Sequence, residues 1–253
     1  MKLYSFLILL RILQYSRNLK PKETKTAMPK VTEEYIQNKK NKIVDAAYKL
    51  CLRQTVSTVT MQDIINETGL SQGGIYRFYK DIDEIFSDMI LYLRQKESIK
   101  EKLDEILKQA DELPPREITN LIFDMLADFM ERELMGIEKI DFELSVLAMN
   151  NPARVGKILK NIPGIGNMEY LTMRTMEYFM KQAASGRIHP RIGVEELLSF
   201  ISSAYTGIQT NCIVNNCYKH EENPLADYYQ PEVQLQTLAH IVNYLIGEEK
   251  GIR

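Results

Sequence analysis

Residue types that often perform catalysis or bind metals are few in this chain and poorly spaced for either role. The cysteines and histidines are Cys51, Cys212, Cys217, His189, His220 and His240. Cys212, Cys217 and His220 could suggest metal or thiol sensing, but five residues of helix turn through about 500°, so the two sulfur atoms would lie on different faces. No Ser/Cys–His or carboxylate–His pair and no glycine-rich phosphate loop stands out. We therefore predict a protein that is not an enzyme and that holds no metal or cofactor.

A different chemistry, hydrogen bonding to nucleic acid, is suggested by TMQDIINETGLSQGGIYRFYK, from Thr60 to Lys80. Gln72 stands near the start of a short helix, where a glutamine can pair bidentately with adenine. Gly73 and Gly74 each weaken an isolated helix by roughly 1 kcal/mol relative to Ala. We expect them where helical backbone approaches a groove wall or a thymine methyl group. The predicted DNA-binding residues are Thr60, Ser71, Gln72, Gly73, Gly74, Tyr76, Arg77, Phe78 and Lys80.

Two short helices must position these side chains. Thr60 is a good N-cap for a helix that begins at Met61, Gly69 is a typical C-terminal stop, and Ser71 can cap the next helix. The apolar residues that could lock the corner between the helices are Ile64, Ile65, Leu70 and Ile75. Two helices joined by such a turn form the DNA-binding helix-turn-helix. The alternative is a helical hairpin without any role in nucleic-acid binding.

The rest of the chain also has helical periodicity and no tract that indicates a β-sheet. Apolar residues from Ile85 to Leu93 form one face of a helix that follows Asp81, and a heavily charged segment then runs to Pro114-Pro115. Further helices are expected at about 116–135, 137–149, 167–185, 193–217 and 231–248. The sequence thus predicts an all-α protein with a tail over 1–30, a helix-turn-helix domain over 31–80 and a larger helical domain over 81–253.

Composition limits the kinds of partner. The 253 residues are 45% apolar and 26% charged, with a net charge of −2, which excludes a uniformly basic coat for nucleic acid. Residues 1–42 nevertheless carry ten Lys and Arg against three acids, a balance of +7 that is compatible with an anionic partner. Three cysteines are too few for a disulfide framework, so we predict a reducing, cytoplasmic location.

The first 27 residues have three alternative interpretations. The apolar run from Leu3 to Leu10 is too short to span a membrane, and Arg11 interrupts it. It could be a secretory signal, although no small-residue cleavage site follows closely. It could touch a membrane, or it could be a tail upstream of a translation start at Met28. We favour the tail and expect no stable membrane association.

The residues NKIVDAAYKL and STVTMQDIINETGLSQGGIYRFYKDIDEIF resemble the N-terminal domain of the TetR/AcrR family of transcriptional repressors. The matching features are Ala46-Ala47, Thr60, Gly69-Leu70-Ser71 and the segment Ile75–Tyr79, and the resemblance covers about residues 38–95. By position it implies that Thr60 and Tyr76 contact phosphates and that Gln72, Gly73, Gly74 and Phe78 face bases. The family usually has a lysine where this chain has Ile82, and Lys80 could supply that phosphate contact instead.

The same resemblance implies that the C-terminal helices bind a small molecule and form a homodimer. Met and aromatic side chains suit an adaptable apolar pocket, and they equally suit an ordinary core. The predicted effector-pocket residues are Phe123, Met125, Phe129, Met130, Met173, Met176 and Phe179. Asp124, Asp128 and Asp141 could meet a cationic lipophilic ligand or could belong to a solvated helix face.

Small residues in the tract over 193–217 would let two helices approach closely, and the last helix could complete a four-helix interface. The predicted dimer residues are Ser203, Ala204, Gly207, Ile208, Leu238, Ile241 and Leu245. A dimer would set two such DNA-reading helices about one turn of DNA apart, on a roughly palindromic operator. We therefore predict a ligand-responsive repressor that binds double-stranded DNA. The alternative is an all-α interaction or scaffold protein whose N-terminal helices merely pack.

Overall fold

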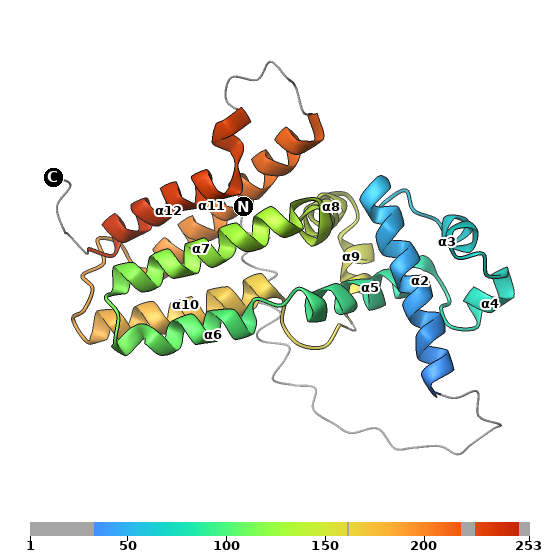
Figure 1. Ribbon diagram of the computed structural model, residues 1–253, viewed down its shortest axis with the longest axis horizontal. Helices are drawn as coiled ribbons and strands as arrows, with labels where there is room; N and C mark the ends of the chain where they lie inside the picture. Colours follow the sequence, from blue (N-terminus) through green and yellow to red (C-terminus); the bar gives the residue numbers. More distant parts are fainter. Residues whose placement is uncertain (1–32, 161, 219–225, 248–253) are drawn as a thin grey trace. The chain divides into compact units, whose positions relative to one another are not determined.

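The computed structural model describes residues 33–160, 162–218 and 226–247, and these residues form helices without any strand. The predicted all-α class is confirmed. The elements in chain order are α2 (Glu33–Arg53), α3 (Met61–Thr68), α4 (Gln72–Tyr76), α5 (Ile82–Lys96), α6 (Lys100–Lys108), η1 (Gln109–Asp111), α7 (Pro115–Glu133), η2 (Leu134–Glu138), α8 (Lys139–Asn150), α9 (Pro152–Lys160), α10 (Asn167–Ala184), α11 (Val194–Tyr218), η3 (Ala226–Tyr229) and α12 (Pro231–Leu245). Figure 1 shows them along the chain.

The chain divides into two units at Lys42 and Ile43, inside helix α2. The described part of the first unit is the exposed N-terminal half of that helix, in which Gln37 donates to Asn41 at 2.8 Å. Lys39, one of its basic residues, lies over the ring of Tyr35 at 5.4 Å. The predicted tail over 1–30 lies outside the described residues.

The second unit has one continuous apolar core that runs from Ile43 to Ile246. It includes residues on both sides of the domain boundary predicted at position 80, such as Tyr79 and Phe86. Full burial of a side chain such as Phe86 contributes roughly 1.5–3 kcal/mol. The helix-turn-helix and the larger helical domain therefore share one set of packed apolar residues.

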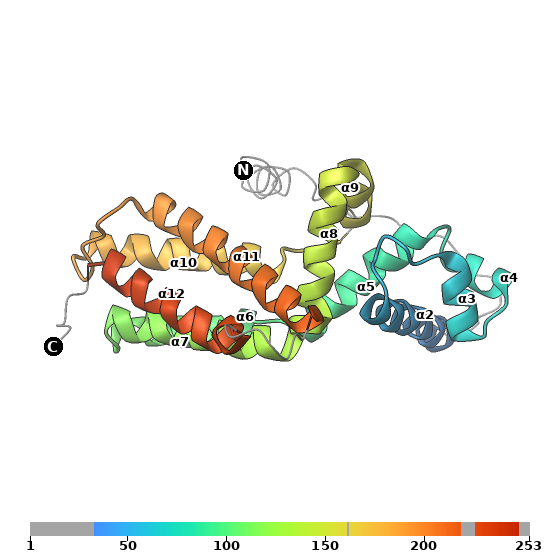
Figure 2. The same ribbon diagram turned by 90° about the horizontal axis from the view of Figure 1, so that it is seen from above.

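Five helices of the larger domain lie side by side. Helix α7 packs against α12, α12 against α11, α11 against α10 and α10 against α6, an arrangement that Figures 1 and 2 show from two directions. Helices α8 and α9 pack on each other, and α9 also packs against α5. None of the described helices is long and apolar enough to cross a membrane.

Five elements were not expected from the sequence: helices α6 and α9, the π-helical turn η2, and the short 3₁₀ helices η1 and η3. Helix α6 lies in the heavily charged segment before Pro114, where Leu103 and Ile106 supply its buried side. Helix α9 follows the Asn-Pro break, and Asn151 Oδ1 accepts from the backbone N–H of Arg154 at 3.2 Å in its first turn. Short helices of this kind depend on what they pack against more than on their own periodicity.

Candidate nucleic-acid interface

Helix α3 is closed at both ends by the residues that the sequence indicates. The Thr60 hydroxyl accepts from the backbone N–H of Asp63 at 3.2 Å, and the Asp63 carboxylate accepts from the backbone N–H of Thr60 at 2.9 Å. This capping box also lowers the pKa of Asp63, chiefly because of its hydrogen bonds with Thr60. Gly69 ends the helix at φ 64°, a left-handed conformation that favours glycine. A replaced cap of this type typically costs about 1 kcal/mol.

Helix α4 is only five residues long, and its two sides are sharply different. Ile75 is fully buried, as is Ile64 of α3, so the predicted corner between the helices is confirmed. Gln72, Tyr76 and Arg77 are exposed on the other side. The buried apolar side chains thus fix the short helix while its polar side chains stay available to a partner.

The two glycines of α4 have different surroundings. A Cβ atom added to Gly73 would meet nothing within 4 Å, so the described residues give no reason for the missing side chain. A Cβ atom added to Gly74 would lie 3.2 Å from Oγ of Ser71, the N-cap hydroxyl that accepts from the N–H of Gly74 at 3.2 Å. Gly73 therefore leaves bare backbone on the exposed side, whereas Gly74 has a local packing reason as well.

Three further positions refine the predicted interface. Phe78 is half-buried and packs against the core, so only part of its ring is available to a base. Ile82, at the position where the family usually has lysine, also packs partly against the core. Lys80 is exposed, and its backbone N–H donates to the Glu84 carboxylate at 2.8 Å. The structure thus leaves Lys80, and not residue 82, free to meet a phosphate.

Helix α9 braces the start of α5 through charged side chains. Arg154 donates to Asp83 at 2.8 Å, and Lys157 donates to Asp81, the N-cap of α5, at 2.7 Å. The hydrogen bond from Lys157 is the main cause that lowers the pKa of Asp81. Ser87 adds a hydrogen bond of 2.6 Å to the carbonyl of Ile158. This support was not predicted, because α9 was not expected from the sequence.

The comparison with protein families decides which kind of helix-turn-helix this is. Residues 43–89 match the family described as bacterial regulatory proteins, tetR family. The helix-turn-helix of this chain is therefore of the tetR type. This confirms the resemblance proposed from Ala46-Ala47, Thr60 and the Gly69-Leu70-Ser71 turn. A tetR-family member is a transcriptional regulator with a DNA-binding helix-turn-helix and is not an enzyme.

Several relatives and solved structures are similar to this protein over most of its length. YfiR of Bacillus subtilis (strain 168), an HTH-type transcriptional regulator, is 23% identical over 199 residues, which are 79% of this chain and 92% of YfiR. GusR of Salmonella enterica is similar in structure, with a TM-score of 0.54 at 15% identity over 86% of this chain and 99% of GusR. FadR of Bacillus halodurans, a regulator of fatty acid degradation, is also similar in structure. Its TM-score is 0.53 at 15% identity, over 85% of this chain and 97% of FadR. At these identities, the two structures support the fold alone.

The residues predicted for an effector pocket are not all in the interior. Phe123, Met125, Phe129, Met130 and Phe179 are buried, and Met176 packs partly against the core. Met173 is 47% exposed on α10, so it is removed from the pocket prediction because an exposed side chain cannot line an interior site.

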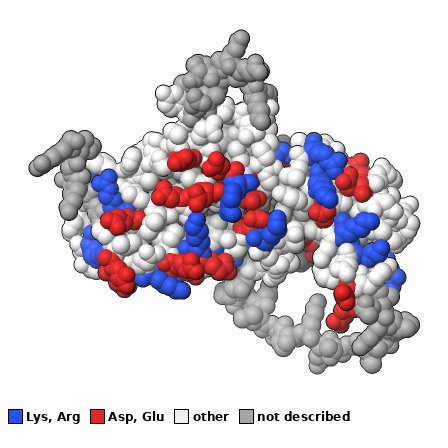
Figure 3. All heavy atoms as spheres, in the orientation of Figure 1, with Lys and Arg blue, Asp and Glu red and all other residues white. Residues whose placement is uncertain are grey.

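The acidic residues considered for a cationic ligand fall into two groups. Asp124 and Asp128 are exposed on α7, and Asp128 pairs with Lys102 at 3.1 Å. Figure 3 shows acidic side chains gathered over α6 and α7, which is a solvated face. Asp141 differs, because burial raises the pKa of its carboxyl group.

Glu138, in the π-helical turn η2, is a buried acidic residue that was not predicted from the sequence. Its side chain is buried, 4% exposed, and accepts from Gln209 at 2.5 Å and from the Tyr205 hydroxyl at 3.4 Å. Burial raises the pKa of Glu138 to about 7, and nearby Asp141 adds to the shift. The sequence signal was a glutamate among buried apolar neighbours, Ile137 and Ile140, at helical spacing.

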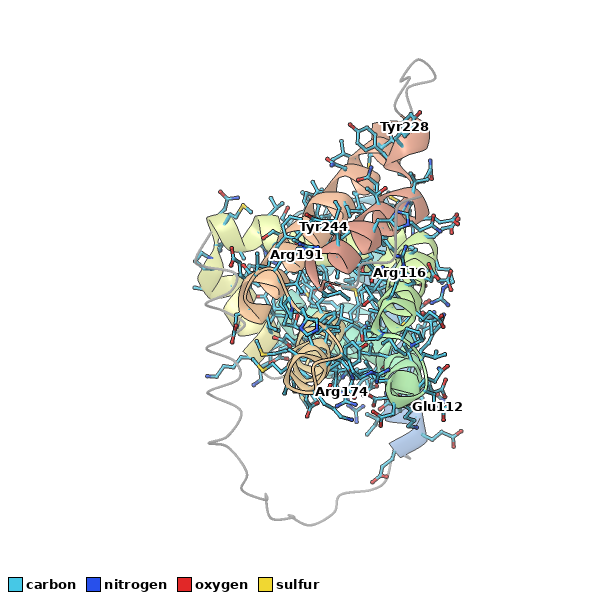
Figure 4. The ribbon with its side chains drawn as sticks, turned by 90° about the vertical axis from the view of Figure 1, so that its left-hand side faces the viewer. Glu112, Arg116, Arg174, Arg191, Tyr228 and Tyr244 are labelled. Atoms are coloured by element: carbon cyan, nitrogen blue, oxygen red, sulfur yellow. The ribbon has the colours of Figure 1, made fainter. Side chains whose placement is uncertain are left out.

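Some of the residues predicted for a dimer interface are exposed and others are buried. Ser203, Gly207 and Ile241 are exposed, and Ala204 and Leu245 are half-buried. Ile208 and Leu238 are buried in the core of their own chain, so they are not available to a second copy. Figure 4 looks along the bundle and shows Tyr244 on α12, with Arg191 beside it at 4.4 Å from the ring centre.

Two of the three thiols, those of Cys51 and Cys212, are in settings that do not favour reactivity. Cys51 and Cys212 are buried and Cys217 is exposed. Burial raises the pKa of Cys51 to about 12 and that of Cys212 to about 11, which keeps both as uncharged thiols at neutral pH. No group of His, Cys, Asp and Glu among the described residues could hold a metal ion, and His220 lies outside that part of the chain.

Proposed function

We propose that this regulator is a cytoplasmic repressor that binds a two-fold-symmetric operator as a homodimer and is released by a small apolar effector. The observation that carries the DNA-binding part is the exposed side of α4. There Gln72, Tyr76 and Arg77 point away from the core, and a Cβ atom added to Gly73 would meet nothing within 4 Å among the described residues. Helical backbone without a Cβ atom can approach a groove wall closely, and Gln72 near the helix start can reach a base edge.

The test is a selection of duplex sites with the purified protein, followed by titration of the selected duplex. We expect Gln72→Ala to lose about 10-fold in affinity and to relax the preference at one base pair, since a bidentate pair contributes roughly 1–3 kcal/mol. Tyr76→Phe, which removes a phosphate contact, should weaken all sequences by a similar factor. Tyr92→Phe is the matched control, because Tyr92 is equally exposed at 45% but lies on α5 outside the helix-turn-helix. Wild-type protein that binds no duplex at low ionic strength would contradict the proposal.

The dimer part is supported by exposed apolar side chains that recur along α11 and α12. They are Phe200, Val214, Val233, Ile241 and Tyr244, next to the small residues Ser203 and Gly207. An exposed apolar face of this kind is typical of an interface between copies in a symmetric dimer.

A substitution at Gly207 can test whether this face forms the dimer interface. A Cβ atom added there meets nothing within 4 Å, so the single chain should tolerate a larger side chain. We expect Gly207→Arg to convert a dimer into monomers in sedimentation experiments, with a loss of operator affinity of at least 100-fold. Gly156→Arg on α9 is the control, because that helical glycine also has nothing within 4 Å. Equal sedimentation of wild type and Gly207→Arg would rule out this face as the interface.

The effector part rests on the mixture of Met, aromatic and acidic side chains inside the larger domain. Buried residues such as Phe123, Met130 and Phe179 provide an adaptable apolar interior. An effector can release DNA only if it binds one of two conformations more tightly than the other. Screening of compounds for release of the selected duplex tests this part directly.

A further inference from the structure

The π-helical turn η2 lies against helix α2 of the helix-turn-helix. Gly136 has non-helical backbone angles there, φ −103° and ψ −114°. A Cβ atom at Gly136 would lie 2.9 Å from the hydroxyl of Tyr48, on α2, so that hydroxyl takes the space of a side chain. Single π-helical turns inserted into α-helices often mark functional sites. The break in the helix therefore occurs where the larger domain contacts α2.

Two charged residues of α8 hold the backbone at the end of α2 and in the segment that follows it. Lys139 and Glu143 form an ion pair of 2.7 Å with side chains only 12% and 14% exposed. Lys139 Nζ also donates to the carbonyl of Cys51 at 2.9 Å, and Glu143 Oε2 accepts from the backbone N–H of Val56 at 2.7 Å. A cation at the last turn of a helix satisfies a free carbonyl group and suits the helix dipole. We call Lys139 and Glu143 the α2 clamp.

The clamp is placed to control the position of α3. The segment from Gln54 to Val59 connects α2 to Thr60, the N-cap of α3, and Val56 within it is buried. Because Glu143 holds the Val56 amide within this short connection, we expect a shift of Glu143 relative to Val56 to move the start of α3. The helix-turn-helix would then present α4 at a different angle.

The opposite side of the same turn contacts the interior of the larger domain. Glu138, adjacent to Lys139 in the chain, bonds to Tyr205 and Gln209 of α11. The charged groups that act on it are Asp141 on α8 and Glu133 at the end of α7, both acidic. None of the described Lys and Arg residues forms an ion pair with Glu138. The charge of Glu138 is therefore not neutralised by a basic side chain. Binding of a proton or a cation should stabilise this turn more than it would stabilise a carboxylate that already has an ion-pair partner.

We propose that Lys139 and Glu143 are positioning residues for DNA binding, and that the turn η2 transmits the state of Glu138 to them and so to helix α3. The inference rests on the proposed DNA-binding function and adds to it the residues that connect the larger domain with the helix-turn-helix. A change at Glu138 alters the turn, the turn carries Lys139, and the clamp holds the backbone that precedes α3.

The first experiment measures the affinity of full-length variants for a duplex selected with the wild-type protein. We expect the double variant Lys139→Met, Glu143→Gln to bind at least 10-fold more weakly while helical content is unchanged. Lys102→Met is the control, because it removes an exposed ion pair with Asp128, and it should bind within twofold of wild type. If wild type binds no duplex, the proposed function fails. If wild type and the double variant bind equally well, the function stands and the clamp is refuted.

The second experiment tests transmission without DNA. Glu138 does not bond to Val56, yet we expect Glu138→Gln to change hydrogen exchange at the Val56 amide at least threefold at pH 8. In wild type, the exchange rate of the Val56 amide should differ between pH 6 and pH 8 after correction for the intrinsic effect of pH on exchange. In Glu138→Gln this difference should disappear. Glu131→Gln, at an exposed acid of α7, should leave the exchange as in wild type. Identical Val56 exchange in wild type and Glu138→Gln at both pH values would overturn the proposed transmission, whatever the clamp does for DNA binding.

Discussion

The helix-turn-helix and the larger helical domain bury different kinds of side chain. Around α3 and α4 the buried residues are apolar, and the one buried polar residue, Thr68, donates to the Ile64 carbonyl at 2.8 Å and accepts from the Leu70 N–H at 3.2 Å. The larger domain buries Thr119, Gln182 and Asn243, each with an oxygen that has no hydrogen-bond partner among the described residues. It also buries Glu138.

This difference suits the different tasks of the two regions. A structure that reads DNA needs a fixed geometry, which full packing and satisfied hydrogen bonds provide. An interior with unsatisfied polar groups is less stable, but it can gain more from a ligand, a proton or a rearrangement. We therefore expect substitutions to have opposite consequences in the two regions.

The largest effect is expected in the helix-turn-helix core. Ile64→Ala should lower the free energy of unfolding by about 2–5 kcal/mol, because the side chain is fully buried and the corner cannot collapse around the cavity. Urea denaturation measures the loss. Ile65, the next residue, is only partly buried, so Ile65→Ala should lower the free energy of unfolding by clearly less than Ile64→Ala does. Equal losses at the two positions would show that the corner is not tightly packed.

The next effect depends on pH. Burial raises the pKa of Glu138 from 4.5 to about 7, so the folded protein holds this proton more tightly than the unfolded chain does. The stability that the proton provides is present below pH 4.5 and is lost as pH rises to about 7. Glu138→Gln should therefore gain stability relative to wild type over this range, by about 3 kcal/mol at pH 8.

Thermal denaturation at pH 4.5 and pH 8 measures that difference, with Glu131→Gln as the exposed control. A stability difference between Glu138→Gln and wild type that is the same at both pH values would mean that Glu138 is ionised throughout.

The smallest effect compares two buried threonines. Thr119→Val should raise the free energy of unfolding by about 1 kcal/mol, because it removes a buried hydroxyl group that has no partner. Thr68→Val should lower it by about 1 kcal/mol, because that hydroxyl makes hydrogen bonds on both sides of the α3–α4 turn. Urea denaturation of the two variants shows whether each substitution raises or lowers the free energy of unfolding. Destabilisation by both would argue that the two interiors are alike.

Local patterns were enough to predict the helix-turn-helix. Thr60, Gly69 and Ser71 are where they were expected because capping and left-handed turns depend on a few neighbouring residues. The long helices α7, α10, α11 and α12 were also located closely, because each has a sustained apolar side. Their predicted roles in effector binding and dimerisation remain predictions, except where burial removes Ile208 and Leu238 from the dimer face and exposure removes Met173 from the pocket.

Short-range spacing of caps, glycines and apolar positions was enough to predict the all-α class and the exposed residues of α4, and the family followed from the resemblance of residues 38–95. The burial of Glu138, the support of α5 by α9, and the hydrogen bonds from Lys139 to Cys51 and from Val56 to Glu143, across 88 and 87 residues, could not be predicted in this way. Burial and long-range hydrogen bonds depend on which helix faces come together. No periodicity within a single helix specifies its partner.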